Sequence, residues 1–146
     1  MMLTKDKDIA STASYKVQCI SLDGLVSERM DKNDKIAFIK IDIDGSEFAL
    51  FRGGIETIRK HKPIIFIEFS PAMIKRANED PKDYFTMLCD EFIVFWYNNQ
   101  ALQRVKSSDY AVIENEAKGG ITDLLLAYTD CDFLSSIVDQ HPQKKV

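Results

Sequence analysis

The sequence of 146 residues predicts a single α/β domain. Apolar, β-rich runs, of which Ile64–Phe69 is the clearest, alternate along the chain with segments of helical periodicity. The apolar fraction of 45% and the charged fraction of 29% are ordinary for a globular domain, and the chain is long enough to bury a hydrophobic core. Neither an internal repeat nor a low-complexity linker divides the sequence, so one domain is expected.

The first expected elements lead to a strand that ends in a carboxylate. Residues 1–14 mix polar and small side chains without periodicity, and we expect a flexible leader there. Residues 15–20 alternate polar and apolar side chains, as a half-buried or edge strand does. Residues 21–30 have the character of a short helix and are followed by a polar loop over 31–35. The β-rich run Ile36–Asp42 then predicts a strand.

A helix is expected after that strand. Asp44 can cap its first turn, and Glu47, three residues later, can reach back to the cap as in a capping box. Apolar residues then recur at helical spacing on one face, namely Phe48, Phe51, Ile55 and Ile58. The helix should end before Pro63, because the residue before a proline disfavours the helical conformation.

The second half of the chain continues the alternation. The run Ile64–Phe69 is apolar throughout, which predicts a strand covered on both faces. Asp80-Pro81 starts a helix with proline at its first position. The remaining expected elements are strands at 92–97 and 101–105 joined by a turn at Asn98-Asn99, a short helix at 108–116, a strand at 121–128 and a polar tail at 130–146. This order implies at least one right-handed βαβ unit and a hairpin.

Charge and residue spacing exclude several functional classes. A formal net charge of −4 argues against a nucleic-acid partner, which usually requires a basic stripe. The basic run Arg59–Lys62 is expected to end a helix, where cations complement the helix dipole. The cysteines and histidines lack metal-ligand spacing, and no apolar run is long enough to span a membrane. No signal-peptide pattern is present near the start, so we expect a cytoplasmic protein with reduced thiols.

Acidic residues follow two of the expected strands. Asp42 ends the first, and Glu68 stands near the end of the second. Ligands of open α/β sheets bind beyond the carboxyl ends of the strands. If the two strands are neighbours, these carboxylates converge on one crevice. There they could position a hydroxyl group, deprotonate it, or hold a divalent cation.

A purely structural interpretation of these charged residues is also open. Asp44 and Glu47 would then only cap a helix. Lys40 would only pair with an acid, and Glu68 would accept a hydrogen bond from a backbone donor. Spacing alone does not choose between the two interpretations.

Four stretches of the sequence together resemble the FkbM methyltransferase family. They are Ser21-Leu22-Asp23, Ile36–Glu47 with its core Lys40-Ile41-Asp42, Leu50–Gly54, and Lys62–Glu68. The family pattern has a Leu-Asp pair, a strand ending in Lys-Ile-Asp-x-Glu-Gly-x-Glu, a Leu-x-Gly-Ala helix, and a Pro-led strand ending in Glu. The resemblance covers residues 15–128, with Asp44 standing where the family usually has Glu.

The resemblance implies both a fold and an activity. The fold would be a partial Rossmann-like class I methyltransferase sheet, its C-terminal half, with helices packed on it. The activity would be transfer of a methyl group from S-adenosyl-L-methionine to an oxygen of a small molecule or sugar. In that role Asp42 would lie near the methyl acceptor, and Lys40 would tune its charge. Glu68 would line the pocket, and Asp44 would contact the cofactor.

The family also implies a part that is missing from this sequence. Family members open with a strand and a glycine-rich turn, whose glycines let the backbone approach the cofactor. This chain has six glycines but no Gly-x-Gly, and too few residues precede Leu22 for two strand–helix units. We therefore expect residues 15–129 to form a partial methyltransferase domain that is inactive alone. The alternative is a non-catalytic remnant that serves as an interaction or assembly module.

The missing part should leave one side of the strand at 36–42 uncovered. An unpaired apolar edge is a template for another strand. We expect either residues 15–20 or a second copy of the chain to cover it, and Lys16 and Gln18 favour the second copy because they suit a buried strand poorly.

Overall fold

The computed structural model describes residues 18–98, 101–117 and 120–128. In chain order the elements are α1 (Leu22–Arg29), β1 (Phe38–Ile41), α2 (Glu47–Arg52), α3 (Ile55–His61), β2 (Ile64–Phe69), α4 (Pro71–Arg76), α5 (Pro81–Glu91), β3 (Ile93–Asn98), β4 (Ala101–Val105), the 3-10 helix η1 (Ser107–Asp109), α6 (Tyr110–Ala117) and β5 (Thr122–Ala127). The expected leader and C-terminal tail, and the middle of the turn after Asn98, lie outside the described residues.

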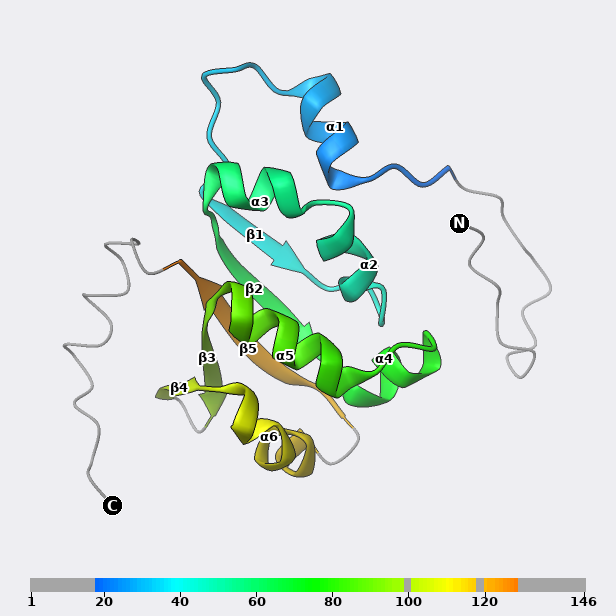
Figure 1. Cartoon of the computed structure of the whole chain (residues 1–146), viewed down its shortest axis with the longest axis vertical. Coiled ribbons are helices and arrows are strands. Elements are labelled where there is room, and N and C mark those ends of the chain that lie inside the picture. The colour runs from blue at the N-terminus through cyan, green and yellow to red at the C-terminus, as the bar shows by residue number, and fades with distance from the viewer. Residues whose placement is uncertain (1–17, 99–100, 118–119, 129–146) are drawn as a thin grey trace.

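The strands form one mixed sheet with the order β1-β2-β5-β3-β4 (Figure 1). β1 and β2 are parallel and are connected through α2 and α3, which confirms the expected βαβ connection. β3 and β4 form the expected hairpin. β5 inserts between β2 and β3 and is antiparallel to both, an arrangement that the sequence did not predict. The α/β class is therefore confirmed.

Local sequence signals explain where several helices begin. The Ser21 hydroxyl accepts a hydrogen bond from the Gly24 N–H at 3.1 Å and caps α1. Asp80 caps α5, with Pro81 at its first position, as expected. Ser70 and Pro71 provide the same kind of start for α4. The sequence prediction omitted this short helix.

The helix expected after β1 differs from the prediction in two ways. It is divided at Gly53-Gly54 into α2 and α3, because two consecutive glycines weaken a helix. A Cβ atom at Gly54 would lie 2.9 Å from Leu22 Cβ, so α1 packs directly against this break. The prediction that Asp44 caps the helix is wrong, since Ser46 is the N-cap residue and makes no side-chain cap bond.

The two faces of the sheet differ in their burial. Figure 1 shows α2, α3 and α5 in front of the sheet, and the core lies between these helices and the strands. In β2, Ile65, Ile67 and Phe69 are buried, whereas the residues between them are only half-buried. Among the described residues, β2 is therefore fully buried on the side that faces the helices and only partly buried on its second side. We call the second side the open face.

The edge of the sheet at β1 is not covered by a strand from residues 18–20, the described part of one of the two segments expected there. Residues 18–20, the described part of the expected strand 15–20, have no regular structure, and Ile20 is exposed. β1 pairs with β2 alone among the described strands, so it is the edge of the sheet. Its Phe38 side chain is 58% exposed.

Candidate active site

The register of the sheet brings Asp42 and Glu68 to the same edge. Ile41, the last residue of β1, lies opposite Ile67 in the parallel strand β2, and Asp42 and Glu68 are the residues that directly follow this pair. Carboxyl ends of parallel strands meet at one edge, which is where α/β sheets bind ligands. The expected convergence of these two acids at one edge agrees with the structure.

A third acid at this edge was missed by the sequence analysis. Asp123 lies directly opposite Glu68 in the antiparallel pair β2–β5. Because β5 runs against β2, its first residues lie where β2 ends. Asp123 stands near the start of an apolar strand and not at its end, so the rule used for the other two acids could not find it. We call Asp42, Glu68 and Asp123 the acidic edge.

Lys40 lies within the same group of charges. Its Nζ donates a hydrogen bond to Asp42 Oδ2 at 2.9 Å, and both side chains are about half exposed. The hydrogen bond to Asp42 raises the pKa of Lys40, and the charges of Glu68 and Asp123 raise it further. The expectation that Lys40 pairs with an acid is confirmed. An ion pair this exposed contributes little to stability, so its effect is mainly on the local charge.

The turn after β1 is held in a conformation that only a few residues adopt easily. Asp44 has φ 53° and Gly45 has φ 95°, both in the left-handed region. A Cβ atom at Gly45 would lie 2.5 Å from the Met73 carbonyl oxygen, so the turn packs against the backbone of α4. The buried Glu47 accepts a hydrogen bond from the Ile43 N–H at 3.2 Å through Oε1. These contacts fix the path of the chain just beyond Asp42.

Asp44 itself is exposed and lies two residues beyond Asp42 in this turn. Its backbone conformation suits a turn residue, since aspartate tolerates the left-handed region better than most side chains. The structure therefore gives Asp44 a position next to the acidic edge but no role in capping α2.

Aromatic residues on β3 flank the acidic edge in two different ways. Trp96 faces the helices, is buried, and donates from Nε1 to Thr122 Oγ1 at 2.7 Å. Tyr97 lies opposite Asp123 in the register and is 46% exposed. Trp96 thus anchors the start of β5 within the core, whereas Tyr97 is available beside the acids.

Other possible sites lie away from this edge. A cavity of about 600 Å³ between α2, α3 and α5 has an apolar base that includes Phe51 and Met87. A second cavity of about 420 Å³ lies between α1 and α3. Neither is lined by a residue of the acidic edge. We place the candidate chemistry at the edge, because cavity size alone carries no information about reactivity.

Within residues 18–98, 101–117 and 120–128, no group of three or more His, Cys, Asp or Glu side chains is arranged to hold a metal ion. Over the same residues, every helix is too short or too polar to cross a membrane.

Comparison with known proteins gives one match. The profile of the family described as the methyltransferase FkbM domain matches residues 3–99. This span contains Lys40, Asp42, Asp44 and Glu68, and Asp123 lies outside it. No curated protein and no solved structure matches the chain.

Proposed function

The chain belongs to the FkbM methyltransferase domain family, and on this basis we propose that it carries the acceptor-binding edge of an S-adenosyl-L-methionine-dependent O-methyltransferase. The sheet would be the C-terminal half of a Rossmann-like class I methyltransferase fold. The acceptor would be a hydroxyl group of a small molecule or sugar. The observation that supports this most directly is the pairing of Ile41 with Ile67, because Asp42 and Glu68 directly follow these residues at the carboxyl ends of two parallel strands.

The acids at this edge suit the handling of an acceptor hydroxyl. When oxygen is methylated, the hydroxyl group must be oriented and must lose its proton, and a carboxylate within hydrogen-bond reach can accept that proton. We assign this role to Asp42. Lys40 donates to Asp42 Oδ2 and so leaves Oδ1 as the oxygen that faces the acceptor. Glu68 would accept a second hydrogen bond and fix the orientation of the acceptor.

The glycines of this chain suit cofactor binding less well than the acids suit binding of the acceptor. Close approach of the backbone to a ligand requires glycines that have open space beside them. Gly45 stands three residues after Asp42, and its free side is filled by the backbone of Met73. At Gly54 the corresponding space is filled by the side chain of Leu22. We therefore propose that this chain alone binds S-adenosyl-L-methionine weakly or not at all and is inactive alone.

A chimera tests the proposed activity. The glycine-rich half of a complete family member would be fused before residue 15, and transfer of a radiolabelled methyl group to that member's own acceptor would be measured. We expect the chimera to be active and D42N to lower kcat by about 100-fold or more. The matched control E116Q, an exposed acid on α6, should leave kcat unchanged. Full activity of both D42N and E68Q chimeras would contradict the assignment.

A second candidate function is a non-catalytic assembly module. It is favoured by the exposed apolar surface of the open face, where Phe38 and Tyr97 are 58% and 46% exposed. The edge of β1 is the part of this surface that can add a further strand. We propose that a second copy of the chain pairs there.

A further inference from the structure

The open face carries a small hydrophobic cluster that is separate from the main core. Its buried members are Phe95 and Ala127, and partly buried residues pack against them, namely Ile93, Leu102 and Leu125. Phe95 lies opposite Leu125, which lies opposite Phe66 on the second side of β2. Because residues paired across neighbouring strands point to the same face, this cluster lies on the open face.

The burial of the cluster indicates that a further segment covers it. Every member comes from β3, β4 or β5, and no described helix contributes a residue. Phe95 is nevertheless only 4% exposed. A side chain on an uncovered sheet face meets solvent on its outer side, so burial of this degree requires a cover. The described helices pack on the main core and do not provide one.

The C-terminal segment, residues 129–146, begins beside this cluster. β5 starts opposite the end of β2 and ends at Ala127, so the chain leaves the sheet at a member of the cluster (Figure 1). Apolar residues of the segment recur at the spacing of one helical face, namely Phe133, Leu134, Ile137 and Val138. Asp132 stands before this pattern, where an N-cap is expected, and Pro142 follows it, where a helix ends.

The length of the C-terminal segment suits a return along the open face. A helix over residues 133–141 would be about 14 Å long. The strand from Asp123 to Ala127 spans about the same distance, ~14 Å. Residues 129–132 form a connection of ordinary length for the reversal. The end of this helix would therefore lie over the start of β5, and the chain continues from there to Lys144 and Lys145.

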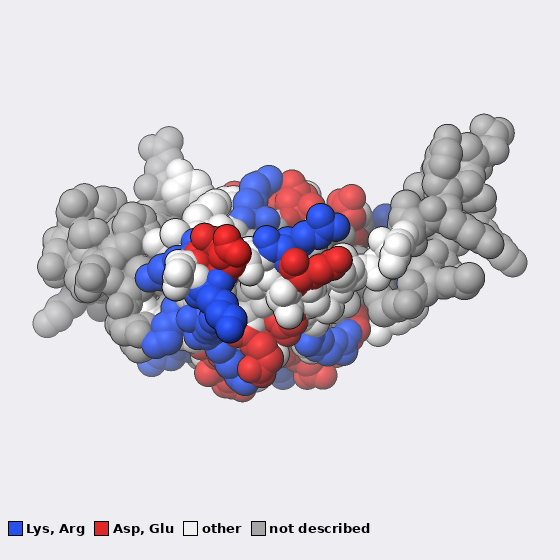
Figure 2. All heavy atoms as spheres, turned by 90° about the horizontal axis from the view of Figure 1, so that it is seen from above, with Lys and Arg blue, Asp and Glu red and all other residues white. Residues whose placement is uncertain are grey.

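The acids at the start of β5 complement these two lysines. Glu68 and Asp123 lie opposite each other in the pair β2–β5. Lys40 is bonded to Asp42, whereas Glu68 and Asp123 form no ion pair within the described residues. On the face seen from above in Figure 2, by contrast, acidic and basic side chains are interspersed. The two acids thus offer a place where additional cations are favourable.

We propose that the C-terminal segment folds back over the open face of its own chain. The apolar side of residues 133–141 covers the cluster, and Lys144 and Lys145 face Glu68 and Asp123. The docking itself does not depend on the methyltransferase activity. It has a consequence that rests on the proposed function, because a docked segment covers part of the acidic edge and so restricts access of the acceptor.

Carbodiimide cross-linking of the full chain tests the contact between the lysines and the acids. The reagent activates a carboxylate, the amine of a neighbouring lysine attacks it, and an amide forms as a urea leaves. Mass spectrometry after proteolysis should find Lys144 or Lys145 joined to Glu68 or Asp123 in chains that keep the mass of a monomer. Absence of these links would overturn the proposal. Links found only in chains of dimer mass would also overturn it, since a second copy would then supply the segment.

Two adjacent substitutions show whether the apolar side of the segment is what docks. I137D places a charge on that side, and the matched control S136D places the same charge on another side of the helix. I137D should remove the cross-links and shift the amide signals of Phe95 and Leu125 in the ¹⁵N spectrum of the full chain. S136D should retain the cross-links and leave those signals in place. Equal behaviour of the two variants would refute the proposed docking.

Discussion

Asp23 of α1 and Thr57 of α3 are joined by a hydrogen bond of 2.7 Å from the Thr57 backbone N–H to Asp23 Oδ1. Thr57 is in the first turn of α3, whose N–H groups have no partner within the helix. The N-cap residue, Gly54, has no side chain that could satisfy them. Asp23, one of the residues that resemble the family pattern, therefore caps a helix from a distant part of the chain.

Removal of this distant cap should destabilise the fold. We expect D23A to lower the free energy of unfolding by about 0.5–2 kcal/mol, as is typical for lost helix caps. D23N retains an acceptor oxygen and should lose less. Urea denaturation of the three proteins measures both differences. Equal stability of D23A and the unmodified chain would show that the bond between α1 and α3 is unimportant.

The backbone of the turn after β1 predicts that substitutions at the adjacent residues Asp44 and Gly45 change the stability of the fold differently. G45A would place a Cβ atom 2.5 Å from the Met73 carbonyl in a backbone with φ 95°. Left-handed backbone in a non-glycine residue costs about 1–3 kcal/mol, and the contact adds to this. D44G removes such a residue at φ 53° and should be neutral or stabilising. Thermal unfolding compares the two, and a G45A variant as stable as D44G would contradict the described turn.

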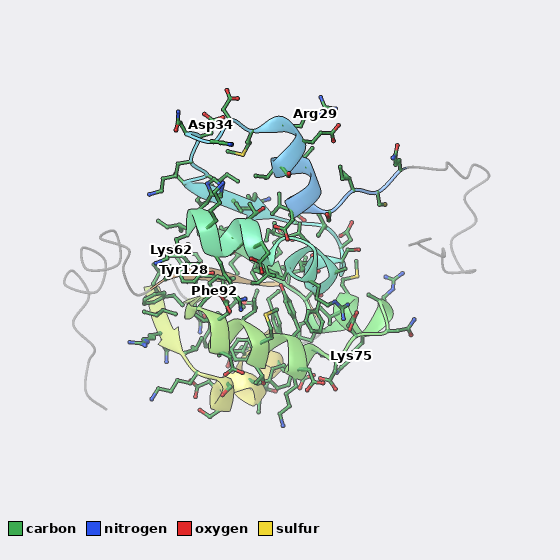
Figure 3. All side chains as sticks on the ribbon, turned by 45° about the horizontal axis from the view of Figure 1, so that its top comes forward. Arg29, Asp34, Lys62, Lys75, Phe92 and Tyr128 are labelled. Atoms are coloured by element: carbon green, nitrogen blue, oxygen red, sulfur yellow. The ribbon has the colours of Figure 1, made fainter. Side chains whose placement is uncertain are left out.

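A small cluster at the far end of the sheet predicts a pH dependence. Figure 3 shows Lys62, Tyr128 and Phe92 side by side, and the Tyr128 ring meets Phe92 edge-on at 5.1 Å. The Tyr128 hydroxyl donates to Glu91 Oε1 at 3.0 Å. The guanidinium of Arg59 donates to both carboxylate oxygens of Glu91, at 2.9 and 2.7 Å. The Arg59 bonds, aided by that of Tyr128, lower the pKa of Glu91.

The lowered pKa of Glu91 determines how its contribution to stability changes with pH. A carboxyl group whose pKa is lower in the folded state stabilises the fold above its unfolded pKa of about 4.3, and this contribution is lost as the pH falls through the folded value. E91Q should therefore be less stable than the unmodified chain at neutral pH, and the difference should shrink in acid. Denaturation curves at several pH values measure it. A difference that does not change with pH would argue against the ionised contact.

The edge of β1 predicts self-association. Ile64 N–H bonds to the Ala37 carbonyl at 3.0 Å, so the backbone groups of the alternate residues Phe38 and Lys40 point away from β2. In an antiparallel two-fold pairing about Ile39, Phe38 of one copy lies opposite Lys40 of the other. Such a pair is favourable, since a cation is attracted to an aromatic ring.

Light scattering at several protein concentrations tests this pairing. The unmodified chain should show a mass that rises with concentration, and F38K should remain monomeric because two cations would then face each other. V112K changes an equally exposed apolar residue on α6 and should behave as the unmodified chain does. A monomer at every concentration of the unmodified chain would refute the second-copy proposal.

The sequence predicted most helices and strands, and it predicted that Asp42 and Glu68 stand at the same edge of the sheet. These features depend on local sequence patterns. One crossover joins β1 to β2, so their carboxyl ends had to meet if the strands were neighbours. The place of β5 could not be predicted in this way, since its partners are set by packing between distant segments. Asp123 was missed for the same reason. The division of the helix at Gly53-Gly54 had a visible local signal, but the regular apolar spacing around it concealed the break.

We propose that this chain carries the acceptor-binding edge of a methyltransferase but does not bind the cofactor by itself. Calorimetric titration of S-adenosyl-L-methionine into the 146-residue chain tests it most directly. We predict no saturable heat in the micromolar range. A low-micromolar Kd, equivalent to about −8 kcal/mol, would contradict the account, because the glycine-rich half would then be dispensable.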